Sequence, residues 1–152
     1  MSTREVSFVT HLMLVLAAIG IIIASYDSYA IYSGQPLWCP PPIDGCNIVL
    51  VSPYARISGV PVGYLGVIYY LCMFGIVALL GRFPTSRGFR LAAVLGAAVG
   101  VSFSAYFMYI QRTFIHAFCV YCLTSALLTV LLLIAGLTHL RAGRPSDRAM
   151  NV

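Results

Sequence analysis

The hydrophobic positions along the chain form four long apolar stretches, and the segments between them contain seven of the eight prolines. Each stretch supplies about 20 residues, the length an α-helix needs to cross the hydrocarbon core of a bilayer. The pattern therefore predicts four membrane-spanning helices, at about residues 8–32, 63–81, 91–111 and 118–140.

Composition supports the same fold class. The chain is 61% hydrophobic and only 9% charged, whereas a soluble domain carries roughly 25% charged residues. We therefore expect an all-α integral membrane protein in which four antiparallel helices form one domain, residues 1–152, surrounded by membrane lipid. From the length we expect no further fused soluble domain.

The charge distribution predicts the orientation in the membrane. The chain has nine arginines, no lysine and four acidic residues, which gives a net charge of +5. The first and third loops hold only Arg56 and Arg112, while seven arginines flank the other ends of the spans. By the positive-inside rule both termini are cytoplasmic, in a cell membrane. Because the arginines lie between apolar spans, nucleic acid is not expected as a partner.

The first loop contains a pair of cysteines, Cys39 and Cys46, on either side of three prolines and an Asp44-Gly45 turn. Such a turn can bring two Cα atoms to the ~5.5 Å that a disulfide needs. The entropic gain from closing so short a loop is about 2.5 kcal/mol, which is small for a structural crosslink. An exposed loop disulfide of this kind is easily reduced, as a redox relay requires.

The apolar run 47–51 follows the second cysteine and is too short to cross the membrane. It is expected to form a half-helix that lies in the interface as a lid over the bundle. Asn47, Ser52 and Tyr54 are candidates for hydrogen bonds beneath this lid. The alternative is that the same side chains only cap local turns.

A second cysteine pair, Cys119 and Cys122, opens the last span. The i and i+3 spacing puts both sulfurs on one helical face. Free N–H groups and the positive dipole at a helix start stabilise a thiolate, the species that attacks disulfides. His116 precedes the pair, either as an ordinary loop residue or as a cation that lowers a thiol pKa.

Two other readings of the four outer cysteines remain open. In the first reading the cysteines form purely structural disulfides in a four-span membrane protein. In the second they bind zinc, as Cys-x-x-Cys pairs often do. The zinc reading lacks accompanying histidines or glycine knuckles, so no metal is expected. Thiol trapping separates a structural disulfide, which stays uniformly oxidised, from a relay that shows mixed redox states.

Four features together resemble the vitamin K epoxide reductase family, most closely its prokaryotic, DsbB-like members. They are Cys39-x6-Cys46, the Ser52-x-Tyr54-Ala55 run, Gly59-Val60-Pro61 and the Cys-x-x-Cys that opens the last span. The likeness covers about residues 28–125 and departs from the vertebrate pattern at Ala126, where a tyrosine is usual.

The resemblance implies a membrane thiol–quinone oxidoreductase that supports disulfide bond formation. Cys39 would exchange with a thioredoxin-like, DsbA-like partner in the outer compartment, and Cys46 would be its resolving cysteine. Cys119 would receive electrons from Cys46, and Cys122 would face a quinone, either ubiquinone or menaquinone. The residues expected to contact the quinone are Cys122, Asn47, Ser52, Tyr54 and Tyr109.

Other chemistry-bearing residues lie within the spans. Cys72, in the middle of the second span, is expected to pack inside the bundle as a small apolar residue. Asp27 is the only acid in a span; intramembrane acids are often functional, although water reaches the outer end of a helix. An interfacial aromatic belt explains most of the remaining tyrosines, Tyr26, Tyr29, Tyr32 and Tyr106.

Overall fold

The structure is a computed structural model that describes residues 3–41 and 45–142. Four long helices form an up-and-down bundle: α1 (Thr3–Ser33), α3 (Val62–Arg82), α4 (Arg87–Ile110) and α5 (Val120–Ala142). Each is long and apolar enough to cross a membrane. The predicted membrane bundle is confirmed, although α1 and α4 begin a few residues earlier than their apolar stretches do.

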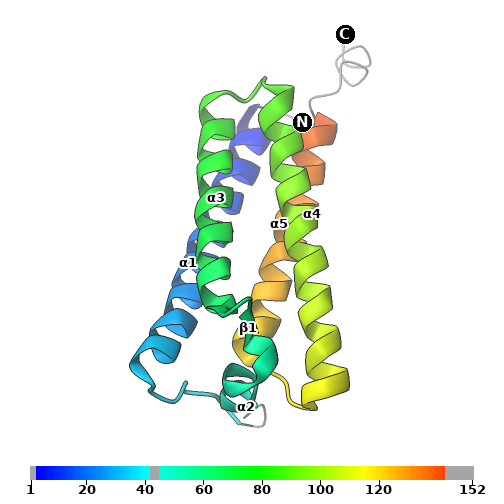
Figure 1. The fold of residues 1–152 in the computed structure, drawn as a ribbon. Helices are drawn as coiled ribbons and strands as arrows, with labels where there is room; N and C mark the ends of the chain where they lie inside the picture. Colours follow the sequence, from blue (N-terminus) through cyan, green and yellow to red (C-terminus); the bar gives the residue numbers. More distant parts are fainter. Residues whose placement is uncertain (1–2, 42–44, 143–152) are drawn as a thin grey trace.

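The arrangement of the helices separates the molecule into two unlike ends. Helix α1 packs against α3 and α5, and α4 packs against α5 and α3. The start of α1, the end of α5 and the α3–α4 connection lie at one end, and the short elements of the first loop lie at the other (Figure 1). Cys39, Cys46, Cys119 and Cys122 belong to the end that carries the short elements of the first loop.

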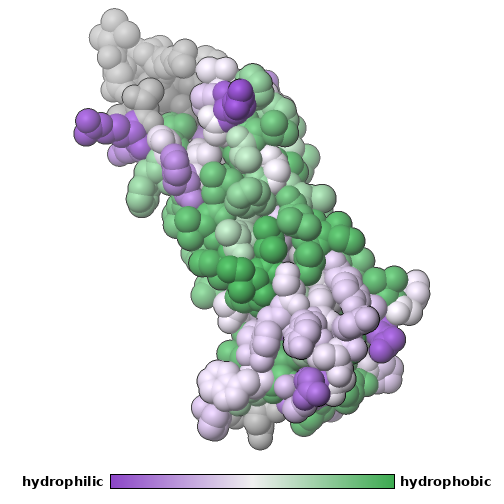
Figure 2. All heavy atoms as spheres, turned by 90° about the vertical axis from the view of Figure 1, so that its left-hand side faces the viewer, coloured by the Kyte–Doolittle hydropathy of each residue, from purple (hydrophilic) through white to green (hydrophobic). Residues whose placement is uncertain are grey.

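The bundle has a packed interior and an apolar outer surface. Its core contains the fully buried side chains of Met13, Tyr70, Met73 and Leu132. Gly20 makes room for the ring of Tyr70, since a Cβ there would overlap it. Large apolar side chains also cover the outside, and Figure 2 shows this apolar surface between two more polar ends. Such a surface is suited to lipid.

The first loop folds into short elements at the cysteine end: α2 (Cys46–Val51), η1 (Pro53–Ala55), β1 (Arg56–Ile57) and β2 (Val60–Pro61). The two strands pair antiparallel. Ser58 and Gly59 both have positive φ, as a tight two-residue hairpin turn requires. Helix α2 is the expected half-helix lid, with one face directed at the bundle.

Helix α4 continues beyond its predicted end as a π-helical turn, η2 (Gln111–Ile115). His116 then adopts a left-handed conformation, with φ of 56°, and ends the turn. The connection between the third and fourth predicted spans is therefore helical for most of its length. Insertions of this kind are frequent at functional sites.

Candidate functional site

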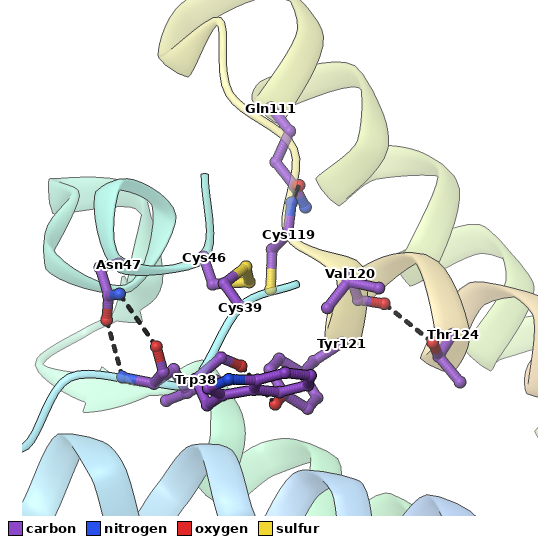
Figure 3. The surroundings of a disulfide bond; sticks show 10 residues. Trp38, Cys39, Cys46, Asn47, Gln111, Cys119, Val120, Tyr121 and Thr124 are labelled. Atoms are coloured by element: carbon purple, nitrogen blue, oxygen red, sulfur yellow. Dashed lines mark hydrogen bonds between the residues drawn. A yellow bond between two sulfur atoms is a disulfide. The ribbon is translucent and has the colours of Figure 1, made fainter. Parts of the chain in front are cut away.

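The first loop carries a disulfide between Cys39 and Cys46, whose Cα atoms are 6.1 Å apart. The segment before Cys39 is fixed from two sides (Figure 3). Asn47 of α2 accepts a hydrogen bond from the N–H of Leu37 (2.8 Å) and donates one to its carbonyl (3.1 Å). Tyr121 of α5 donates from its hydroxyl to the carbonyl of Trp38 (2.6 Å). The loop is thereby held between α2 and α5.

Cys119 lies beside this disulfide. Cys46 and Cys119 are both buried in one small cluster, against which Cys39 and Cys122 pack. Figure 3 shows the Cys119 sulfur directed toward the Cys39–Cys46 bond. The two cysteine pairs, far apart in the sequence, therefore form one group of sulfur atoms.

Gly45 allows this close approach. A Cβ built on Gly45 would lie 2.6 Å from the carbonyl oxygen of Phe118 and 2.9 Å from both its nitrogen and the Cβ of Ala117. Two of these atoms belong to the backbone and cannot rotate away. Any side chain at position 45 would push the start of α2, and with it Cys46, away from Cys119.

Gln111 holds Cys119 in place from the other side. The fully buried side chain of Gln111 accepts a hydrogen bond from the Cys119 N–H at 2.9 Å through its Oε1. The carbonyl of Cys119 accepts the N–H of Leu123 at 3.0 Å, so Cys119 occupies the N-cap position of α5. Both backbone groups of Cys119 are thus satisfied, and its orientation is fixed.

The environment of Cys119 favours its thiolate. A hydrogen bond from the Cys122 thiol is the main cause that lowers the pKa of Cys119 below its ordinary value. The backbone N–H groups of Tyr121 and Cys122, at the start of α5, act in the same direction. Burial and the charge of Asp27 oppose the shift but do not reverse it.

A cavity of about 380 Å³ opens next to the sulfur atoms and extends between the four long helices. Its wall is mostly apolar and includes Cys46, Cys119 and Cys122. Two polar atoms on this wall, Oδ1 of Asp27 and the hydroxyl of Tyr69, are buried without a hydrogen-bond partner. The size and lining are those of a site for a mainly apolar small molecule.

Comparison with known proteins agrees with this arrangement. The sequence pattern that defines the vitamin K epoxide reductase family matches residues 11–137. The chain belongs to this family.

The chain is also similar to a curated relative, Thiol-disulfide oxidoreductase LTO1 of Arabidopsis thaliana. The two are 34% identical over 111 residues, which cover 69% of this chain but only 30% of the relative. Family and relative together support a thiol oxidoreductase role for this multi-pass membrane protein.

The quinone-contact residues suggested by the family resemblance occupy different surroundings. Cys122 lines the cavity, whereas Asn47 and Ser52 do not. Asn47 is engaged with the backbone of the preceding loop, as described above. The Ser52 hydroxyl donates to the carbonyl of Val49 at 2.7 Å, next to the end of α2. The Ser52 bond is of the local kind that the sequence left as the alternative, whereas the two bonds of Asn47 reach a loop residue ten positions earlier.

Tyr54 and Tyr109 also lie outside the cavity lining. Both rings pack against Phe114, with centroids 5.5 Å and 6.3 Å away. Tyr109 is 60% exposed, on the outside of α4. Its surroundings fit the interfacial aromatic belt better than a quinone pocket.

The prediction that Cys72 packs inside the bundle was wrong. Cys72 is exposed on α3, because a small apolar side chain suits a lipid-facing surface as well as a core.

Sequence reasoning took Gly45 only as part of a turn and missed its close contact, and it also missed Gln111 and Tyr69. The first two act through contacts with residues that are distant in sequence, and spacing gives no signal for such contacts. Tyr69 did carry a signal, since a hydroxyl in an apolar span needs a hydrogen-bond partner or a ligand. Within residues 3–41 and 45–142, no group of three or more His, Cys, Asp or Glu side chains is placed to hold a metal ion.

Proposed function

We propose that the protein is a membrane thiol–quinone oxidoreductase that supports disulfide bond formation. The observation that carries this proposal is the position of Cys119, which packs beside the Cys39–Cys46 disulfide and, together with Cys122, lines the cavity. A purely structural disulfide has no need of a buried thiol, held in a thiolate-favouring position, at its side.

The first half of the reaction is thiol–disulfide exchange with a soluble partner. A thiolate of the partner attacks the sulfur of Cys39, and Cys46 leaves as a thiolate. The second thiol of the partner then attacks the mixed disulfide and leaves Cys39 reduced. The partner is oxidised by two electrons, which now reside on Cys39 and Cys46.

The second half passes these electrons inward. The thiolate of Cys46 attacks Cys119 in a Cys119–Cys122 disulfide, and Cys122 leaves. Cys39 then attacks Cys46, which restores the outer disulfide and releases Cys119. Gln111 fixes the backbone of Cys119 and thereby keeps its sulfur aligned with Cys46 during both transfers.

The cavity fits a quinone headgroup as the final electron acceptor. Its volume of about 380 Å³ and its apolar wall suit a ring with an apolar tail. The unpartnered hydroxyl of Tyr69 is a donor for a carbonyl oxygen. When bound, a ubiquinone or menaquinone supplies two-electron oxidation of the Cys119 and Cys122 thiols.

The partner is a thioredoxin-like, DsbA-like protein in the outer compartment. Trp38, next to Cys39, is 70% exposed and offers an apolar contact for such a partner. The name of the Arabidopsis thaliana relative, a thiol-disulfide oxidoreductase, supports the same class of substrate. In this orientation both termini are cytoplasmic, and an impermeant maleimide should label reduced Cys39 only from outside the cell.

Trapping variants test the order of electron flow. Cys46→Ala should accumulate a mixed disulfide between Cys39 and the partner, because the resolving thiol is gone. Cys122→Ala should accumulate a Cys46–Cys119 bridge and should not reduce quinone. The matched control is Cys72→Ala, which replaces an exposed cysteine on α3 and should behave as wild type. If neither relay variant traps an adduct while wild type turns over, the proposed order is wrong and the disulfide is structural.

A further inference from the structure

Asp27 is a half-buried acid with no role in the thiol exchange between the two cysteine pairs. It lies on α1, on the wall of the cavity, and its Oδ1 is buried without a hydrogen-bond partner. Other buried polar groups nearby are satisfied. The Ser28 hydroxyl donates to the carbonyl of Ala24, and the Tyr70 hydroxyl is hydrogen-bonded to Ser125. Nε2 of Gln111 and Nδ1 of His139 also lack a partner, but of the four residues with such an atom only Asp27 and Tyr69 line the cavity.

The cavity offers no charge to balance an ionised Asp27. Among the described residues that line it, none is Arg, Lys or His. A buried carboxylate without a cation is costly, so its protonated form is preferred at rest. A protonated carboxyl is a proton donor that faces the space where the quinone would bind.

Asp27 is also close enough to the inner cysteines to respond to them. The thiols of Cys119 and Cys122 both lie within electrostatic reach of its carboxyl group. The other titratable groups near Asp27 are three tyrosines, Tyr69 and Tyr70 on α3 and Tyr121 on α5. Helix α4 contributes only apolar and hydroxyl side chains to the wall. Tyrosines do not ionise near neutral pH, so the exchange of protons in this cavity falls to the carboxyl and the thiols.

We propose that Asp27 is the proton-transfer residue of the quinone-reducing step, an inference that rests on the proposed function. Oxidation of the Cys119 and Cys122 thiols to a disulfide releases two electrons and two protons. The quinone takes up both electrons and both protons and becomes a quinol. Asp27 donates its proton to a quinone oxygen and is reprotonated by a thiol, once for each proton, so it ends the turnover unchanged.

The test compares Asp27→Asn, Asp27→Glu and, as a matched acid on the same helix, Glu5→Gln. With decylubiquinone as the probe and the reduced full-length protein in detergent, oxidation of the inner thiols is followed in a single turnover. General acid–base catalysis contributes about 10²- to 10⁴-fold. Asp27→Asn should therefore slow this step about 100-fold while binding decylubiquinone within about threefold of wild type. Asp27→Glu should recover most of the rate, and Glu5→Gln should lose none.

A second measurement does not depend on turnover. The infrared spectrum of the quinone-free protein should contain the carbonyl band of a buried protonated carboxylic acid. This band should be missing in Asp27→Asn and displaced in Asp27→Glu, which keeps the test decisive if the asparagine variant does not fold. Exchange between Cys39 and a reduced thioredoxin-fold substrate should stay at the wild-type rate in every variant.

Three results would overturn the inference. One is oxidation of the inner thiols in Asp27→Asn within twofold of wild type. Another is a loss of decylubiquinone binding that accounts for the whole rate decrease, which would make Asp27 a binding residue only. The third is an infrared spectrum without an Asp27-dependent acid band. Failure of the proposed function looks different, because wild type itself would then not transfer electrons to decylubiquinone.

Discussion

Replacing Gly45 by alanine should slow the transfer of electrons between the two cysteine pairs. The new Cβ would lie 2.6 Å from the carbonyl oxygen of Phe118, short of ordinary contact at 3.4 Å by about 0.8 Å. The obstacle is backbone at the start of the last helix, so the loop that carries Cys46 must move instead. That movement increases the distance between Cys46 and Cys119, the two sulfurs that must meet.

The size of the effect follows from the cost of overpacking. Extra methyl groups in a packed site cost about 1–3 kcal/mol, and misplacing reacting atoms by ~1 Å can cost as much as 10²-fold in rate. If about 1.4 kcal/mol of this cost appears in the exchange barrier, the rate falls tenfold. We therefore expect exchange between the two sulfurs to be at least about ten times slower.

The assay isolates one bond. In a Cys122→Ala background the thiolate of Cys119 can attack Cys46 in the Cys39–Cys46 disulfide, with Cys39 as the leaving group, and formation of the Cys46–Cys119 bridge is followed by thiol trapping. Gly75→Ala is the matched control, because a Cβ at Gly75 meets no atom within 4 Å. Bridge formation at the same rate in the Gly45 and Gly75 variants would refute the argument that this contact aligns the sulfurs.

Three further outcomes are expected. The pH midpoint for alkylation of Cys119, measured by mass spectrometry, should lie below that of an ordinary thiol, since a lowered pKa keeps the thiolate present at lower pH. Cys122→Ala should move this midpoint upward, because it removes the hydrogen bond that lowers the pKa of Cys119. Val49→Glu should abolish quinone-dependent turnover, while Val51→Glu should have little effect, because Val49 is buried and Val51 is 81% exposed. Gln111→Leu should lower the free energy of unfolding by about 1–3 kcal/mol in thermal or denaturant unfolding, because it leaves the Cys119 N–H unsatisfied.

The sequence predicts the features that depend on local pattern. Apolar length alone locates four spans, since the bilayer imposes that length on every crossing helix. The lid is also predictable, because an apolar run shorter than a span still has to cover its apolar side. The positions of Gly45 and Gln111 were not predictable, since each matters only through a contact with the segment at Phe118 or Cys119.

Tyrosines show why residue type does not by itself locate a binding site. On α4 the cavity is lined by Gly100, Phe103, Ser104 and Phe107, which recur at the spacing of one helical face. Tyr109 lies on the opposite face, nine residues after Gly100 at about 100° per residue. A tyrosine at the end of a span satisfies its hydroxyl in the interface and needs no pocket.

Helical periodicity would have identified Asp27 as the more informative residue. On α1 the cavity is lined by Ile23, Asp27 and Ile31, each four residues after the last, so they form a single stripe. The exposed Tyr26 and Tyr29 lie outside this stripe and fit the aromatic belt. Because this stripe lines the cavity, Asp27 is directed into the bundle, away from the lipid surface. In an apolar bundle such a position is expensive unless the carboxyl exchanges protons with a ligand or a neighbouring side chain.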